Sequence, residues 1–158
     1  FYGASGGGNT GRWIGHKSQF LEGGIRVPAI LSYPAKVPVG ESRDQIITAM
    51  DWYPTVLELC GIQMNPEAPP VDGFSLMPIC NSADAASPYG GVLHFHWGSK
   101  WAVRDGDWKL IGVDGKQNFQ LVSLADENPE TINHAKQRPE LVNRLLELHQ
   151  VWAADVKP

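Results

Sequence analysis

The chain has 158 residues, of which 42% are hydrophobic and 19% charged, as expected for a globular protein of one domain or two small subdomains. A formal net charge of −4 gives no support to nucleic-acid binding, which usually requires a basic patch. No apolar run approaches the roughly 18 residues of a membrane-spanning helix. We therefore expect neither a nucleic-acid partner nor a membrane segment.

The first half of the chain predicts loops, one strand and two short helices. The glycine density of residues 1–15 indicates an irregular loop. The apolar run RVPAILSY at residues 26–33 is bounded by Gly and Pro and predicts a buried strand. DWYPTVLELCG at residues 51–61 predicts a helix, with an aspartate cap at its start and a glycine at its end. DGFSLMPIC at residues 72–80 predicts a brief helical turn.

The second half predicts an antiparallel meander followed by a helix. Short alternating segments, separated by Gly, Asp and Asn, read GVLHFHW, KWAVRD, DWKLIGVD and NFQLVSL. In the last segment Leu141, Leu145, Leu148 and Trp152 form one apolar stripe of a helix. A four-stranded sheet needs a cover, and this helix is the candidate. The expected fold class is α+β.

The stretch GHKSQFLEGGIRVPAI places a lysine, a glutamate and two glycines ahead of the predicted strand. A phosphate-binding loop of the form GxxxxGK[ST] is one interpretation of Lys17 and Ser18. His16 separates Gly15 from Lys17, however, and no strand-forming segment precedes the loop. This interpretation is therefore weak.

The same stretch resembles the sulfatase family, whose members carry a lysine followed by the motif EGGxRxP. Four further segments resemble family motifs in the same order along the chain. DWYPTVLELCGI is similar to an Asp-aromatic-aromatic-Pro-Thr helix, VDGFSLMPI to the turn LDGxSLxPLL, WAVRDGDWKLI to the hairpin AVRxGxWKL, and LVSLADENPETINHA to LYDLxxDPxExxNLA. The resemblance runs from Lys17 to Trp152.

The resemblance implies the C-terminal portion of an arylsulfatase-like protein. Residues 1–85 would be the last piece of a large alkaline-phosphatase-like α/β domain, and residues 86–158 a small antiparallel subdomain with its closing helix. The parent protein would hydrolyse sulfate esters of a small molecule or glycan, using formylglycine and calcium. Two alternatives are a phosphate or phosphonate ester hydrolase of the same superfamily and a non-catalytic carbohydrate-binding module.

Neither Cys60 nor Cys80 lies in the C/S-x-P-S/A-R motif that yields formylglycine, and no Asp-Asn pair precedes Lys17. We therefore expect no metal site in this chain and place the nucleophile and calcium ligands upstream of Phe1. We expect the isolated chain to be inactive. A cut through the large sheet would expose an apolar edge and favour a homo-oligomer.

The resemblance also implies roles for individual residues. Lys17 would contact the sulfate group, where a fixed positive charge is most useful. Glu22 and Arg26 are expected to form structural hydrogen bonds or an ion pair. His96 and Trp97, at a strand end, are candidates for the rim of the substrate cleft, where Trp97 could stack on a ring.

Other polar residues have plainer interpretations. His94 and His96 share one strand face and could ligate a metal, but spacing shows no third ligand, so a polar strand face is preferred. Arg104 and Asp107 flank the Asp-Gly turn and are expected to be surface or turn residues. Asp126, Glu127 and Glu130 form an acidic patch, for which a solvated turn is preferred over a calcium site.

Overall fold

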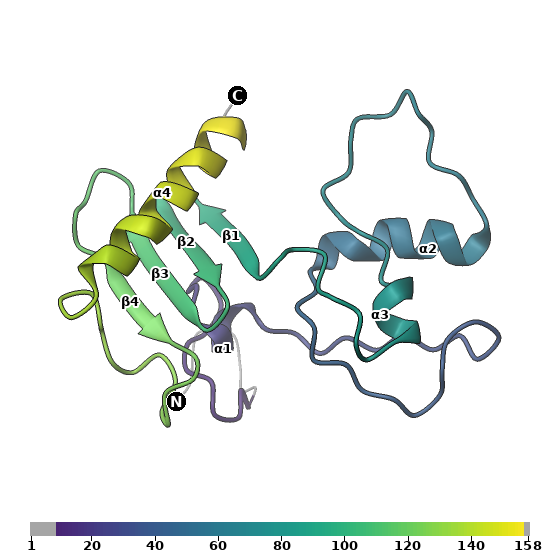
Figure 1. Ribbon diagram of the computed structural model, residues 1–158, viewed down its shortest axis with the longest axis horizontal. Helices are drawn as coiled ribbons and strands as arrows, with labels where there is room; N and C mark the ends of the chain where they lie inside the picture. The colour runs from purple at the N-terminus through teal and green to yellow at the C-terminus, as the bar shows by residue number, and fades with distance from the viewer. Residues whose placement is uncertain (1–8, 157–158) are drawn as a thin grey trace. The chain divides into compact units, whose positions relative to one another are not determined.

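The computed structural model describes residues 9–156 (Figure 1). These residues form two compact units, one that combines 9–28 with 92–156 and one that comprises 29–91. The N-terminal segment therefore packs with the later part of the chain, whereas the sequence predicts that residues 1–85 form one domain and residues 86–158 another. The assignment of residues 1–85 to a large domain of a longer protein stays a prediction, and part of the predicted N-terminal loop lies outside the described residues.

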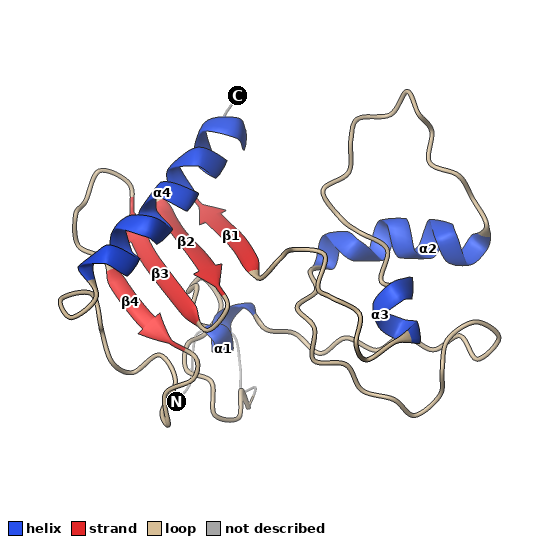
Figure 2. Cartoon of the chain, in the orientation of Figure 1, coloured by secondary structure: helices blue, strands red, loops and turns tan. Residues whose placement is uncertain are grey.

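The first unit contains the predicted four-stranded antiparallel meander (Figure 2). The alternating pattern and the glycine turns of the sequence explain it, because Gly106 of the Asp105-Gly106 pair and Gly98 between β1 and β2 adopt the positive φ that tight hairpin turns require. The register places Val103 opposite Leu110 and Arg104 opposite Lys109. The strands are β1 (Val92–Trp97), β2 (Lys100–Asp105), β3 (Trp108–Val113) and β4 (Gln120–Ser123), in the order β1-β2-β3-β4.

One face of this sheet is covered by the predicted C-terminal helix, α4 (Pro139–Val156) (Figure 1). Leu145 is fully buried against the sheet, as its place in the apolar stripe predicts. Trp101 is 3% exposed, and fully burying a side chain of this size contributes a few kcal/mol, about 25 cal/mol for each Å² of apolar surface. The core consists of Trp101, Val103, Leu110, Leu121, Val142 and Leu145.

The opposite face of the sheet is covered by the N-terminal segment, which contains the single helical turn α1 (Glu22–Ile25). The predicted strand at residues 26–33 is wrong, because no strand is assigned there. Val27 and Ile30 are 79% and 87% exposed, and the segment pairs with no strand among residues 9–156. These residues therefore do not form the sheet edge expected for a homo-oligomer, and self-association stays a prediction.

The second unit contains the predicted helix α2 (Trp52–Cys60), preceded by the 3-10 turn η1 (Ala49–Asp51), and the predicted helical turn α3 (Met77–Asn81). Gly61 ends α2 in the left-handed conformation, with φ 69°. Cys60 and Cys80 are both free thiols. Within the described residues no helix has the length and apolar character needed to cross a bilayer.

Asp51 has a different role from the predicted cap of α2. Its buried carboxylate accepts hydrogen bonds from the backbone N–H of Thr48 (2.6 Å) and of Phe74 (2.9 Å), and from the hydroxyl of Tyr89. The side chain of Thr55 extends this network to the backbone N–H of Leu76 (2.8 Å). Asp51 therefore ties the start of α2 to the segments before α3 and before the sheet.

Candidate functional site

Lys17 lies in an exposed turn at residues 16–19. The backbone N–H of Gln19 donates to the carbonyl oxygen of His16 (3.0 Å), and the Gln19 side chain accepts from the backbone N–H of His16 (3.1 Å). Ser18 has a φ of 78°, a left-handed conformation that residues other than glycine seldom adopt. The turn is thus an ordered structure that presents a lysine to solvent.

The paired glycines of the EGG motif hold this turn against α1. The backbone N–H of Gly23 donates to the carbonyl oxygen of Ile14 (2.8 Å), and a Cβ on Gly23 would lie 2.6 Å from that oxygen. A Cβ on Gly24 would lie 2.5 Å from the carbonyl oxygen of His16 and closer still to that of Gln19. The glycines therefore permit close approach of the Lys17 turn to α1.

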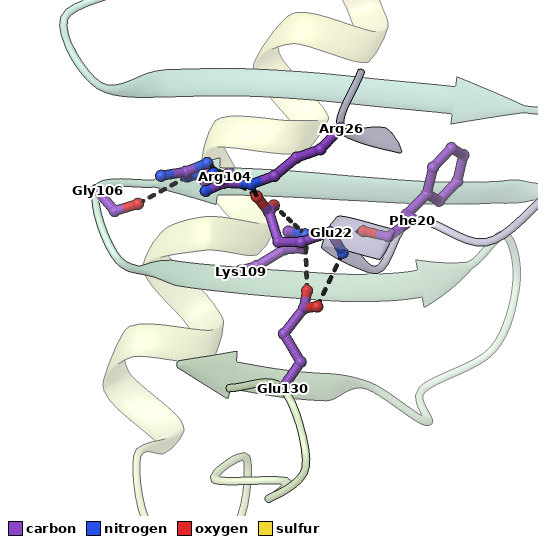
Figure 3. Close-up of polar contacts among 7 residues, drawn as sticks. All are labelled: Phe20, Glu22, Arg26, Arg104, Gly106, Lys109 and Glu130. Atoms are coloured by element: carbon purple, nitrogen blue, oxygen red, sulfur yellow. Dashed lines mark hydrogen bonds and ion pairs between the residues drawn. The ribbon is translucent and has the colours of Figure 1, made fainter. Parts of the chain in front are cut away.

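Beneath α1, the ammonium of Lys109 lies between two carboxylates (Figure 3). Its Nζ is 2.5 Å from Glu22 and 2.8 Å from Glu130, and it donates to the carbonyl oxygen of Phe20 at 2.9 Å. All three charged side chains are at most 1% exposed. A lysine has three N–H donors, and here each of them has an acceptor.

Two arginines complete what we call the Lys109 cluster: Glu22, Arg26, Arg104, Lys109 and Glu130. Arg26 pairs with Glu22 through its Nε, which confirms the predicted ion pair, and its guanidinium stacks 4.0 Å from the ring of Trp13. Arg104 lies 3.4 Å from the same carboxylate and is only 14% exposed. The prediction that Arg104 is a surface turn residue is therefore wrong.

Glu130 also departs from its predicted surface position. It is buried, has a φ of 62°, and accepts a hydrogen bond from the backbone N–H of Glu22 at 2.8 Å. Asp126 instead pairs with His134 at 2.8 Å. The prediction of a solvated turn is therefore wrong for Glu130, because its carboxylate is buried and pairs with the ammonium of Lys109.

The cluster keeps Glu22 ionised. Burial alone would raise the pKa of this carboxyl group, but the hydrogen bond and charge of Lys109, with those of Arg26 and Arg104, outweigh burial and leave the pKa below its usual value. Each charged side chain of the Lys109 cluster is thus paired with at least one group of opposite charge.

Three of the motifs noted in the sequence meet in this cluster. Glu22 and Arg26 belong to EGGIRVP, Arg104 and Lys109 to WAVRDGDWKLI, and Glu130 to ENPETIN. One signal in the sequence points to the cluster: Arg104 and Lys109 are placed to face each other across the Asp-Gly hairpin. Like charges directly opposite are destabilising, so their pairing calls for carboxylates close by.

The two candidate rim residues lie on different faces of β1, as strand alternation requires. The ring of Phe95 lies 6.1 Å from that of Phe20. This contact places Phe95 and Trp97 on the sheet face that is covered by residues 9–28, which we call the Lys17 segment. Trp97 is 58% exposed, with the ammonium of Lys100 5.7 Å from its ring. His96 projects from the α4 face, 3.8 Å from Asp114. The role of both residues at a cleft rim stays a prediction.

His94 is part of the packing of α4. Its ring stacks on Trp152 with 4.9 Å between centroids, and its buried Nδ1 has no hydrogen-bond partner among the described residues. Burial lowers the pKa of His94. Within residues 9–156, no group of three or more His, Cys, Asp or Glu side chains is arranged to hold a metal ion.

The fold and the order of these motif-like segments along the chain indicate a class of protein, and comparison with known proteins identifies it. The family model described as "N-sulphoglucosamine sulphohydrolase, C-terminal" matches residues 11–154. Because this match covers most of the sequence, the chain belongs to the sulfatase family and corresponds to the C-terminal portion of its members.

Several curated sulfatases are similar to the chain. Human steryl-sulfatase is 37% identical over 56% of this chain and 15% of its own length. An uncharacterized sulfatase of Schizosaccharomyces pombe is 31% identical over 88% of this chain and 27% of its own length. Choline-sulfatase of Rhizobium meliloti is 29% identical over 72% of this chain and 22% of its own length. The chain thus spans about a quarter or less of the relatives it matches.

A solved structure confirms the fold. It superposes with a TM-score of 0.68 at 23% sequence identity and covers 87% of this chain and 31% of the other. That structure is described in connection with the metabolism of multiple glycosaminoglycans by Bacteroides thetaiotaomicron. The match therefore confirms the fold that the sequence predicts, a small antiparallel sheet with a closing helix.

Proposed function

We propose that this chain is the C-terminal part of a sulfuric ester hydrolase and that Lys17 contacts the sulfate group of the substrate. The observation that carries the proposal is the position of Lys17, which is exposed at the tip of an ordered turn. The glycine contacts and the Lys109 cluster fix the backbone that follows the turn. Family membership supplies the reaction class.

Sulfate ester cleavage transfers an SO3 group to a nucleophile while the alcohol oxygen leaves. Negative charge lies on the sulfate oxygens throughout and grows on the leaving oxygen. An ammonium held in place beside these oxygens stabilises the transition state without reorganising, and loss of one such preorganised donor typically costs about 10² to 10³ in kcat. That is the role we propose for Lys17.

Calcium and formylglycine belong to this proposal as groups of the longer protein. The described residues do not fit a calcium site, since they contain no suitable cluster of ligands, and neither cysteine lies in the required motif. Relatives are several times longer than this chain, which supports placing both groups in the portion it does not span. We accordingly expect no turnover by the isolated chain.

The substrate would be a sulfated small molecule or glycan. Trp97 supports a ring-containing substrate, because its exposed indole lies on the sheet face that the Lys17 segment covers. Which sulfate ester is cleaved would depend on residues beyond this chain as well.

The test is release of inorganic sulfate by the full-length protein and its Lys17→Ala variant. Substrates are p-nitrophenyl sulfate, choline sulfate and sulfated monosaccharides, with p-nitrophenyl phosphate in parallel. Lys136→Ala is the matched control, since Lys136 is also an exposed turn lysine. We expect sulfate release by wild type and control and a loss of about 10² or more in kcat for Lys17→Ala.

Other outcomes would overturn the proposal. Unchanged activity in Lys17→Ala would remove the proposed role of that residue. Preferential phosphate release would indicate a phosphate ester hydrolase. Saturable quenching of tryptophan fluorescence by sugars, with no hydrolysis of any ester, would indicate a carbohydrate-binding module.

A further inference from the structure

We infer that Lys109 and Glu130 are positioning residues for Lys17, which they hold in place through the backbone of α1. This inference rests on the proposed function for its catalytic consequence, although the mechanical link itself does not. Neither side chain lies in the exposed turn that carries Lys17, and both are fully buried beneath the segment that follows it.

The first link joins Lys109 to the chain just after the turn. Its ammonium donates to the carbonyl oxygen of Phe20 at 2.9 Å, three residues beyond Lys17, and pairs with Glu22 at 2.5 Å. The Phe20 ring packs on Phe95 of β1. The side chain of Lys109, which comes from β3, thus holds the backbone at residues 20–22.

The second link joins Glu130 to the first residue of α1. One carboxylate oxygen accepts from the backbone N–H of Glu22 at 2.8 Å, and the other accepts from the ammonium of Lys109 at 2.8 Å. Glu130 adopts a φ of 62°, which residues other than glycine rarely do, and its backbone N–H donates to Ser123 at 3.1 Å. The connection after β4 therefore adopts an unusual backbone conformation where it reaches α1.

The third link carries this position back to the turn. Gly24 of α1 lies so close to the carbonyl oxygens of His16 and Gln19 that no side chain would fit between them. Gly23 is hydrogen-bonded to Ile14 on the far side of the turn. Because there is no space between α1 and the turn, a displacement of α1 displaces Lys17 as well.

Glu130→Gln is the variant that loosens this linkage with the smallest change in shape. The two oxygens of Glu130 serve two different donors, whereas a glutamine has one oxygen and must turn its NH2 group towards Glu22 N–H or towards Lys109. One contact is therefore lost. Misplacement of a reacting group by about 1 Å can cost on the order of 100-fold in rate, so we expect kcat/KM to fall about 10- to 100-fold.

Asp51→Asn is the matched control for a purely structural effect. Asp51 is also a fully buried carboxylate with several donors, but its hydrogen bonds come from Thr48, Phe74 and Tyr89, all within residues 29–91. Both substitutions remove a buried charge. If stability alone governs activity, the two variants lose activity in proportion to the stability they lose.

The kinetic test is a double-mutant cycle in the full-length protein, assayed well below the unfolding temperature of every variant. If Glu130 acts through Lys17, Glu130→Gln lowers kcat/KM in wild type but not in the Lys17→Ala background. Asp51→Asn leaves kcat/KM unchanged in both backgrounds. A loss of the same factor in both backgrounds for Glu130→Gln would overturn the inference.

A second readout, amide hydrogen exchange in peptides spanning residues 14–21, does not depend on activity. We expect faster exchange in Glu130→Gln and no change in Asp51→Asn. Unchanged exchange in Glu130→Gln would overturn the inference even if the protein is a sulfatase. Faster exchange in a protein that releases no sulfate would refute the proposed function and leave the mechanical link in place.

Discussion

The ammonium of Lys109 lies 2.8 Å from the carboxylate of Glu130, and both side chains are fully buried. One comes from the centre of the sheet and the other from the connection between β4 and α4. Burying two charges is costly unless their remaining hydrogen-bonding groups are also satisfied. Here Glu22 and the Phe20 carbonyl satisfy the other two donors of Lys109, so the pair can persist away from water.

Replacing Lys109 by methionine should strongly destabilise the protein. The change would leave the carboxylates of Glu22 and Glu130 facing each other without a cation between them, and breaking a buried pair in this way typically costs about 3–5 kcal/mol. Urea denaturation measures the change in the free energy of unfolding. Lys136→Met, at an exposed turn, should stay within about 0.5 kcal/mol of wild type. Equal effects of the two substitutions would contradict the structure.

Stability should fall at acidic pH through Glu22. The pKa of this group is below its ordinary value of 4.5 in the folded protein, so the unfolded chain takes up the proton first as pH decreases. The stabilisation is present above pH 4.5 and is lost as pH falls through the lower folded pKa. The free energy of unfolding of wild type, relative to Glu22→Gln, should therefore decrease with acidification. A difference that stays constant with pH would argue against an ionised Glu22.

Substituting Gly24 by alanine should disturb the Lys17 turn. The new Cβ would lie 2.5 Å from the carbonyl oxygen of His16, and backbone on both sides leaves it no room, so we expect a loss of about 3 kcal/mol, the upper end of the usual range for overpacking. Gly40→Ala is the comparison, because Gly40 has a φ of 75° and open space around it and should cost only about 1–2 kcal/mol. A milder effect at Gly24 than at Gly40 would show that the turn does not approach α1 this closely.

Tyr89 should titrate later than an unperturbed tyrosine, whose pKa is 10.0. Burial, together with its hydrogen bond to the Asp51 carboxylate, raises the pKa of Tyr89 to about 12. Tyr89 should therefore remain protonated well above pH 10.0, as followed by phenolate absorbance, and Tyr89→Phe should remove that late step. Because the folded pKa is raised, this contribution to stability is present below pH 10.0 and is lost as pH rises through about 12.

The elements that local pattern determines could be predicted from the sequence. The meander follows from alternating segments separated by Asp-Gly turns, and α4 follows from the stripe of Leu141, Leu145, Leu148 and Trp152. Helix α2 was likewise expected with its terminal Gly61. In each case the signal lies within one short window of sequence, because hairpins and helices are built from local contacts.

The Lys109 cluster could not be predicted in the same way. Glu22 lies 87 residues from Lys109, and Lys109 lies 21 residues from Glu130, so no local window contains the cluster. The apolar run at residues 26–33 has the composition of a strand, but a strand forms only with a neighbour to accept its hydrogen bonds. The contact between Glu22 and Arg26 is local, since both belong to the motif EGGIRVP, and an ion pair is one of the two interactions expected for them.

Lys109 takes its two carboxylate partners from distant parts of the sequence, and this determines which fragments of the protein can be expected to fold. A polypeptide limited to residues 92–156 would retain every strand and α4, yet it would expose Phe95 to solvent and leave a lysine amid the sheet with half of its counter-charge missing. We therefore expect the smallest piece that folds on its own to be discontinuous. Residues 9–28 must accompany it, joined by a linker in place of residues 29–91, whereas a cut at residue 91 alone should yield a chain that fails to fold.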